Sequence, residues 1–287
     1  SYLSIPNEPG FLDLNGDNFL NYTVTASWSQ STLNRGRMAT RGAAQSVAFE
    51  VSAPSVSDLE FYKVTYRGEI FYPVPLLNSW TLRLRTELGY GDGYGDTSEL
   101  PFYEHFFAGG FGSERGYESN TLGPRSTPAE IYNVEQPVTA IDENGIPTEI
   151  GGPDGEDFGY IAVVDPTTGE SRLVFNQVND DPDPFGGNIL IEGGAELLFP
   201  LPFIKDRSKL RSAFFLDAGN VYSDNCRSSQ LNCFNVDDAI DELRYSVGVG
   251  LTWITGFGPM TFSLAKPLNS GEFDEEEVFQ FTLGRGF

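Results

Sequence analysis

The chain has 287 residues, of which 39% are hydrophobic and 14% aromatic, and its formal net charge is −23 at neutral pH. The aromatic content argues against a disordered chain, and the negative charge argues against nucleic acid as a partner, since its binders need basic surfaces. No run of about 18 apolar residues occurs, so the sequence predicts no transmembrane helix.

Segments in which apolar and polar residues alternate recur along the chain, and a period of two predicts β-strands. In the clearest segment, Leu82 and Leu84 lie on one face and Arg83 and Arg85 on the other. Nine such segments predict an all-β protein. In chain order they are 21–28, 46–51, 63–72, 78–91, 188–199, 213–218, 245–253, 259–265 and 278–287.

Two features favour an antiparallel transmembrane β-barrel over a soluble sandwich, which would also alternate. Aromatic residues stand at both ends of the apolar faces, as in the two aromatic girdles of a membrane-spanning strand. The opposite faces carry full charges in mid-strand, which a polar barrel interior tolerates and a dry core does not. The aromatic pairs are Tyr22 and Trp28, Trp80 and Tyr90, and Tyr245 and Trp253.

The connections favour the same architecture. If the chain ends on the periplasmic side, short turns lie on that side and long loops lie outside, which is the outer-membrane rule. The predicted turns are 75–78, 201–209 and 255–257, and the predicted outer loops are 92–187, 219–242 and 267–275. Two connections fit less well: 29–44 is long for a periplasmic turn, and 54–59 is short for an outer loop.

The segment 92–187 concentrates the negative charge, with 19 Asp and Glu residues against three arginines. No calcium-loop pattern fits it, so we expect a solvated acidic surface and no metal. His105 is the single histidine of the chain, which argues against a His-based catalytic or metal site. We expect no enzyme activity and no cofactor.

Cys226 and Cys233 are the two cysteines, and no histidine accompanies them in a zinc-ligand pattern. Their polar setting in a predicted outer loop favours a small disulfide in an oxidising compartment. Two free surface thiols are the alternative.

The chain stops in an alternating strand that carries Phe279, Phe281, Leu283 and a terminal Phe287. A terminal aromatic residue on such a strand resembles the C-terminal sorting signal of bacterial outer-membrane barrels. Nine strands is an odd number, whereas single-chain bacterial barrels are even-numbered. We therefore expect either a count that is wrong by one or a barrel whose first strands precede this sequence.

An ordered set of motifs resembles the BamA-type outer-membrane protein assembly factors, from about residue 18 to Phe287. The motifs are GYGDGYG, PFYEHFFAGG, RGYESNTLGP, FFLDAGNVY, GPMTFSLAKPL and FQFTLGRGF. The resemblance implies a sixteen-stranded barrel preceded by periplasmic POTRA domains. It implies that residues 1–287 form the C-terminal portion of that barrel, with about eight or nine strands present, and that 92–187 is its long sixth extracellular loop.

In that family the sixth loop folds back into the barrel, and its tip carries Val or Ile, then Arg, Gly, and Phe or Tyr. The matching residues here are Glu114, Arg115, Gly116 and Tyr117, and Glu114 departs from the aliphatic pattern. The resemblance pairs Arg115 with the inward carboxylates Glu196 and Asp217. The alternating faces place both of these side chains inside the barrel independently. We call Arg115, Gly116, Tyr117, Glu196 and Asp217 the loop lock.

The resemblance implies a non-enzymatic function in which barrel proteins are inserted and folded into the bacterial outer membrane through a seam, the lateral gate. Residues 277–287 would form the gate strand of this seam. The implied partners are unfolded barrel clients, accessory lipoproteins bound through the periplasmic domains, and the lipid bilayer with its lipopolysaccharide. The alternatives are a two-partner-secretion or TamA-like transporter, a porin, and an adhesin barrel.

A chain of this length cannot close the full sixteen-stranded barrel, and open strand edges are a liability. We expect either a small closed barrel of about eight strands or self-association with a copy, edge to edge. The small barrel has no room for the loop, so in it Arg115 would lose its partners.

Overall fold

The computed structural model describes residues 16, 18–36, 38–75, 77, 79–126, 140–141, 147–148, 158–164, 171–177, 183–201, 209–226 and 230–284. They belong to two compact units. One comprises Ser1–Gly16, Arg125–Asp183 and Arg227–Leu231, and the other comprises Asp17–Pro124, Pro184–Cys226 and Asn232–Phe287.

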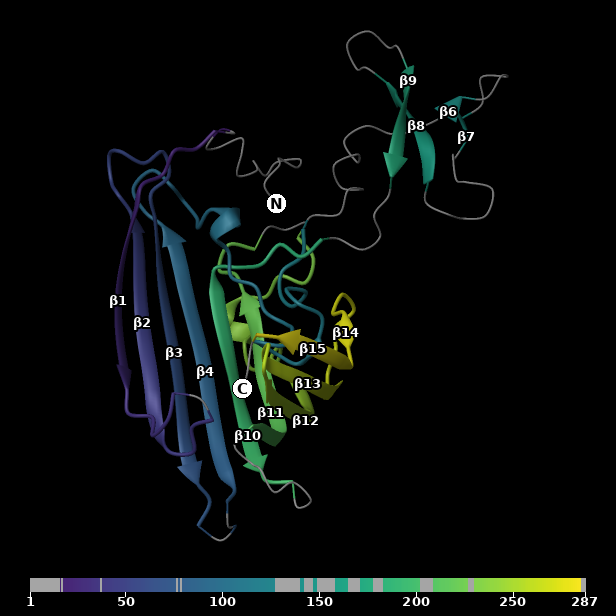
Figure 1. Ribbon diagram of the computed structural model, residues 1–287. Coiled ribbons are helices and arrows are strands. Elements are labelled where there is room, and N and C mark those ends of the chain that lie inside the picture. Colours follow the sequence, from purple (N-terminus) through teal and green to yellow (C-terminus); the bar gives the residue numbers. More distant parts are fainter. Residues whose placement is uncertain are drawn as a thin grey trace. The chain divides into compact units, whose positions relative to one another are not determined.

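The larger unit is built on one antiparallel nine-stranded sheet, which curves around a concave face (Figure 1). Its strands in spatial order are β1 (Thr23–Ser31), β2 (Gly42–Ser52), β3 (Phe61–Pro73), β4 (Thr81–Gly93), β10 (Ile189–Phe199), β11 (Leu210–Tyr222), β12 (Arg244–Thr255), β13 (Gly258–Pro267) and β15 (Phe279–Leu283). Each corresponds to one of the nine predicted segments, so the all-β fold prediction is confirmed.

Most spatial neighbours follow one another in the chain. The longest connection joins β4 and β10, which are hydrogen-bonded to each other although residues 94–188 separate them in the chain. The helical turns of the described residues are two 3-10 turns, η1 (Phe102–Glu104) and η2 (Val236–Asp238). None of the described helical segments has the length and hydropathy needed to span a bilayer.

The segment predicted as one acidic loop contains short elements of its own. Within the larger unit, β5 (Gly116–Tyr117) pairs with β14 (Glu276–Glu277). Within the smaller unit, two hairpins form, which the sequence interpretation missed. They are β6 (Ala140–Ile141) with β7 (Pro147–Thr148), and β8 (Phe158–Val164) with β9 (Ser171–Gln177). The run of Tyr160, Ile161, Val163 and Val164 is rich in aromatic and β-branched residues, which is an ordinary strand signal.

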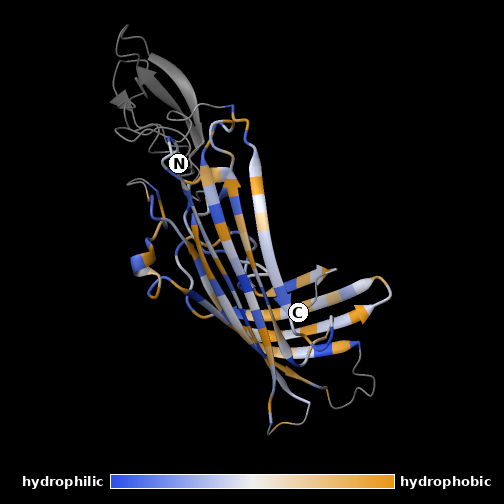
Figure 2. Ribbon diagram, turned by 90° about the vertical axis from the view of Figure 1, so that its left-hand side faces the viewer, coloured by the Kyte–Doolittle hydropathy of each residue, from blue (hydrophilic) through white to orange (hydrophobic). Residues whose placement is uncertain are grey.

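The two faces of the sheet carry opposite chemistry, as predicted, and Figure 2 shows hydrophobic and hydrophilic residues alternating along the strands. Many apolar residues of the convex face are exposed, whereas most charged residues of the concave face are partly or fully buried, with Arg67 as an exposed exception. A surface of exposed aliphatic and aromatic side chains suits lipid. It includes Trp28, Ile70, Leu84, Leu88, Phe214, Val249, Trp253 and Leu264.

The connection predicted at 29–44 is shorter in the structure. The Thr32 amide donates to the Ala43 carbonyl at 2.8 Å and the Asn34 amide to the Arg41 carbonyl at 3.1 Å, so hairpin bonding continues beyond β1. Ala39 then folds inward and is buried, and its carbonyl accepts a hydrogen bond of 2.7 Å from Arg211. Hairpin hydrogen bonding therefore shortens the connection to the residues between Asn34 and Arg41.

The expectation of a small closed barrel is wrong. The sheet order begins at β1 and ends at β15, and the pairs of the described residues contain no bond between those two strands. The concave face instead holds part of the 94–188 segment, including Arg115. A closed barrel of eight strands fills its interior with its own side chains, which would expel this segment.

Candidate functional site

The tip of the long loop, Gly109 to Tyr117, lies against the concave face of the sheet. Gly116 has φ +97°, a left-handed conformation that glycine adopts without strain. A Cβ at this position would lie 3.1 Å from the Ala265 Cβ, so the absence of a side chain also lets β5 approach β13. A glycine at position 116 therefore has two physical reasons, the left-handed backbone and the close approach to β13.

Arg115 is 1% exposed and holds the tip against β11. Its Nε donates to Asp217 Oδ2 at 2.7 Å and its Nη2 donates to Asp217 Oδ1 at 2.9 Å. This parallel pair of bonds uses the planar fork of the guanidinium, which a lysine lacks. Asp217 is fully buried, so the pair is shielded from water.

The same guanidinium reaches a second strand and an aromatic ring. Nη2 of Arg115 lies 2.8 Å from Glu196 Oε1 on β10, and its Cζ lies 3.6 Å from the centroid of the Phe215 ring. Glu196 is 1% exposed. Both carboxylates face inward as the alternation predicted, and the structure brings Arg115 together with both of them.

Two arginines that sequence reasoning did not assign to the site complete it. Arg83 on β4 bonds Glu196 at 3.0 Å and Glu69 on β3 at 3.0 Å. Arg85 on β4 bonds Asp217 at 2.9 Å. The alternation had placed both arginines on the inward face. Their partners depend on how neighbouring strands are aligned, which a single sequence does not show.

Gly194 makes the contact between Arg85 and Asp217 geometrically feasible. It stands opposite both residues in the sheet, between β4 and β11. A Cβ on Gly194 would lie 2.6 Å from Asp217 Oδ1 and 2.9 Å from Arg85 Nε. The arginine therefore reaches across β10 over a position that must remain without a side chain.

The energetic consequence follows from burial. Replacing one partner of a buried ion pair leaves an uncompensated charge and costs about 3–5 kcal/mol. Arg115, Asp217 and Glu196 are each at most 1% exposed, so the loop tip and the three central strands are strongly coupled. The arrangement can hold a loop in place.

Tyr117 connects the tip to the far end of the sheet. The ring is fully buried, and its hydroxyl donates to the Asn269 carbonyl at 2.9 Å. Gln280 on β15 donates from Nε2 to the Tyr117 carbonyl at 2.7 Å. Burial raises the pKa of the Tyr117 hydroxyl to about 12. The tip is thus hydrogen-bonded directly to the last strand.

Glu114, where the family pattern has an aliphatic residue, is fully buried. Its Oε2 lies 2.5 Å from the Ser113 hydroxyl, which also contacts Glu192 on β10. Burial, and after it the nearby charge of Glu192, raise the pKa of Glu114 well above its usual range. The departure from the family pattern thus places a further carboxyl beside the arginine network rather than in water.

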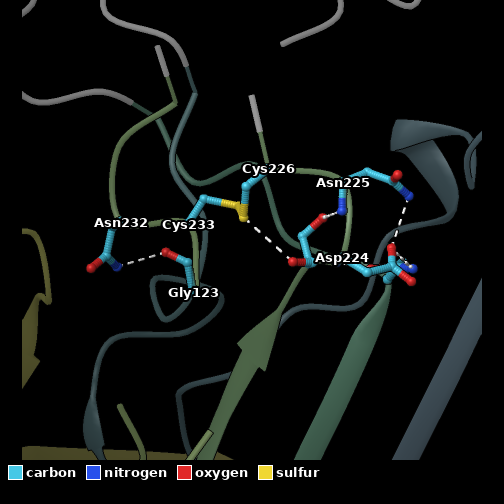
Figure 3. The surroundings of a disulfide bond; sticks show 8 residues. Gly123, Asp224, Asn225, Cys226, Asn232 and Cys233 are labelled. Atoms are coloured by element: carbon cyan, nitrogen blue, oxygen red, sulfur yellow. Dashed lines mark hydrogen bonds between the residues drawn. A yellow bond between two sulfur atoms is a disulfide. The ribbon is translucent and has the colours of Figure 1, made fainter. Parts of the chain in front are cut away.

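Cys226 and Cys233 form the predicted disulfide, which closes part of the connection between β11 and β12 (Figure 3). Beside it, Asn232 Nδ2 donates to the Gly123 carbonyl at 2.7 Å. Asn188, just before β10, donates to Asp224 Oδ1 at 2.7 Å. These bonds fix the disulfide-bearing connection to Gly123, inside the long loop, and to Asn188, just after it.

The predicted gate strand is short. Phe279, Phe281 and Leu283 point to the convex face and are about half exposed. The strand ends at Leu283, and Gly284 follows with φ +93°. Phe287 lies outside the described residues. In the described part of the chain, no group of three or more His, Cys, Asp or Glu side chains is arranged to hold a metal ion.

Comparison with known proteins places the chain in a family. Residues 3–287 match the model of the Omp85 superfamily domain. The chain is 34% identical over 280 residues to the outer membrane protein assembly factor BamA of Neisseria meningitidis serogroup B, covering 93% of this chain and 29% of that protein. It is 33% identical over 103 residues to BamA of Neorickettsia risticii, covering 35% of this chain and 13% of that protein.

A solved structure agrees with the sequence matches. The crystal structure of BamA from Haemophilus ducreyi lacking POTRA domains 1–3 superposes with a TM-score of 0.63 at 25% identity. The match covers 90% of this chain and 41% of that one, so the chain spans less than half the length of these relatives. The chain belongs to the Omp85 superfamily of outer-membrane β-barrel proteins, and it is similar to the C-terminal barrel part of BamA.

Proposed function

We propose that the parent of this chain is an assembly factor that inserts and folds β-barrel proteins into the bacterial outer membrane. The chain would supply the C-terminal portion of its barrel, with 92–187 as the long extracellular loop. The observation that carries the proposal is the buried loop lock, in which Arg115 bonds Asp217 and Glu196. Its support is the likeness to two proteins named outer membrane protein assembly factors.

The working element in this proposal is the edge of the sheet at β15. Five residues of β15 pair with β13, and the sheet order ends there. An exposed strand edge offers unpaired amide and carbonyl groups, which can align an incoming client strand by β-augmentation. The exposed Phe279, Phe281 and Leu283 would face lipid beside this seam. A short apolar belt there would thin the bilayer locally.

The loop lock would position this edge. Gln280 donates to the Tyr117 carbonyl, and Glu277 and Glu276 on β14 pair with Gly116 and Tyr117 on β5. The inner side of the last strand is therefore held by the loop tip, and the tip is held by Arg115. A docked tip keeps β15 in place while its outer edge stays available.

The partners in this proposal are unfolded outer-membrane barrel clients, accessory lipoproteins bound through periplasmic domains, and the bilayer with its lipopolysaccharide. The process makes and breaks no covalent bond, since it exchanges strand hydrogen bonds and apolar contacts. The energy for insertion would come from the folding of the client.

Depletion of the full-length parent in its own bacterium tests the proposal, with folded porins in the outer membrane followed by heat-modifiable gel shift. We expect all porins to decrease together, and an Arg115→Ala copy to restore them much less than the wild type. Arg67→Ala is the matched control, because Arg67 lies in the same sheet with a side chain that is 67% exposed. Persistence of the porins with loss of a single secreted protein would instead assign the chain to a dedicated transporter.

A further inference from the structure

Ser113 contacts two carboxyl groups inside the sheet. Its Oγ lies within hydrogen-bonding distance of Glu114 Oε2 and of Glu192 Oε1, and it also accepts a bond of 2.9 Å from the Gly109 amide. A hydroxyl carries one hydrogen and two lone pairs. The Ser113 hydroxyl can donate its hydrogen to one carboxylate and accept the Gly109 amide with one lone pair. Its remaining lone pair can only accept a hydrogen bond from the second carboxyl group. The other carboxyl must therefore carry a proton of its own.

The arginines of β3, β4 and the loop tip that surround this pair already bond other carboxylates. Arg67 pairs with Glu87, Arg83 with Glu69 and Glu196, Arg85 with Asp217, and Arg115 with Asp217 and Glu196. In the described residues, no lysine or arginine lies within ion-pair distance of Glu114 or Glu192. Arg85 is directed to the Ser113 carbonyl instead. Because no cation of the described residues is left to pair with Glu114 or Glu192, one negative charge on these two carboxyl groups is more favourable than two.

Burial increases the cost of a second charge. Glu114 is fully buried and Glu192 is 5% exposed. Glu114 Oε1 has no hydrogen-bond partner within the described residues. It is pressed against β11, where a Cβ added to Gly219 would lie 1.8 Å from it. An ionised carboxylate with an unsatisfied oxygen is expensive in such a site, whereas the neutral acid is tolerated.

We propose that Glu114 and Glu192 share one proton through Ser113, and that this proton is a second anchor of the loop tip beside Arg115. Glu114 is then a positioning residue, since it acts by holding the residue that follows it. The ionisable groups that face the pair come from every neighbouring strand and from the tip itself: Arg67, Arg85, Glu87, Asp217, Tyr222 and Arg115.

The sign of the pH effect follows from which state holds the proton. An undocked tip exposes Glu114 to water, where it ionises as an ordinary glutamate, while the docked tip retains the proton. Docking is therefore strongest at low pH and weakens as the pH rises through the range of the docked carboxyl, by up to about tenfold per pH unit. A glutamine at position 114 is neutral at every pH and removes this dependence.

Trypsin cleavage after Arg115 reports docking, because Arg115 is 1% exposed in the docked tip. The experiment uses the full-length parent in its native lipids between pH 6 and pH 9. We expect the ratio of wild-type to Glu114→Gln cleavage rates to rise with pH, since the ratio cancels the pH dependence of trypsin itself. Glu272→Gln, at an exposed glutamate of the β13–β15 connection, should follow the wild type. A ratio that does not change with pH overturns the proposal.

Infrared spectroscopy tests the proton directly and does not depend on the variant folding. The wild type should show the C=O stretching band of a protonated carboxylic acid at neutral pH, and the band should vanish over the same pH range in which cleavage begins. Glu114→Gln should lack the band and Glu272→Gln should keep it. Absence of the band from the wild type overturns the proposal. The inference rests on the proposed role of the loop lock, but neither readout requires client assembly, so each proposal can fail without the other.

Discussion

β10 and β11 at the centre of the sheet run for 11 and 13 residues, and each pairs along its length with a strand on either side, whereas β15 runs for five residues and pairs with β13. The centre carries buried carboxylates paired with arginines. The edge carries exposed Phe279, Phe281 and Leu283 and one inward hydrogen bond to the tip. The central strands β10 and β11 are therefore rigid, whereas β15 at the edge has an accessible backbone, and the loop tip contacts both.

Removing a buried charge at the centre should have the largest effect. Asp217→Asn leaves the buried Arg115 and the partly buried Arg85 guanidinium groups short of one carboxylate, so the free energy of unfolding should fall by about 3–5 kcal/mol. Urea titration of the full-length protein in lipid vesicles measures it. If Asp217→Asn lowered the free energy of unfolding no more than the substitution Asp96→Asn at an exposed residue, the buried centre would not be the main source of stability.

The disulfide should stabilise a connection rather than the sheet. Replacing both Cys226 and Cys233 by serine removes a small closed loop, and a typical disulfide contributes about 2–4 kcal/mol. Hydrogen exchange should increase in 223–243 and leave β10 unchanged. Addition of a reductant should reproduce this pattern in the wild type and change nothing in the double variant.

The link between tip and edge should have an intermediate effect. Gln280→Ala removes the donor to the Tyr117 carbonyl and leaves that carbonyl buried, which costs about 1–3 kcal/mol. Hydrogen exchange of β15 amides should quicken while that of β11 amides does not. Thr282→Ala is the matched control, since Thr282 shares the strand face of Gln280. Equal exchange in the two variants would show that the tip does not hold the edge.

An exposed pair in the same charge network should matter least. Arg67 bonds Glu87 at 2.7 Å, but its side chain is 67% exposed, and such pairs contribute about 0–1 kcal/mol. Arg67→Ala should shift the urea midpoint slightly, and raising the salt concentration should abolish the difference. A loss of stability comparable to that of Asp217→Asn would show that burial does not determine how much each ion pair contributes.

Alternation was sufficient to predict the strands and their faces, because a period of two is a local property. It placed Glu196 and Asp217 inside, and the resemblance supplied Arg115 as their partner. It could not pair Arg85 with Asp217, because that contact requires two neighbouring strands to be aligned with Gly194. The β8–β9 hairpin was missed because the acidic turns around it dominated the reading of 92–187. A small closed barrel was one of two expectations, and it is wrong because the carboxylates of β10 and β11 hold Arg115, and with it the loop tip, on the concave face.

The socket for Arg115 is assembled from β4, β10 and β11, and residues 94–188 lie between the first two in the chain. Contacts so distant in sequence form late, because a long segment must first be closed. Arg115 belongs to the same segment that connects β4 to β10. Its guanidinium group therefore cannot bind its carboxylate partners until the three strands have paired. We therefore expect docking of the tip to be the last step of folding. Short pulses of trypsin during refolding into vesicles should still cleave the Arg115–Gly116 bond at times when strand pairing is already complete.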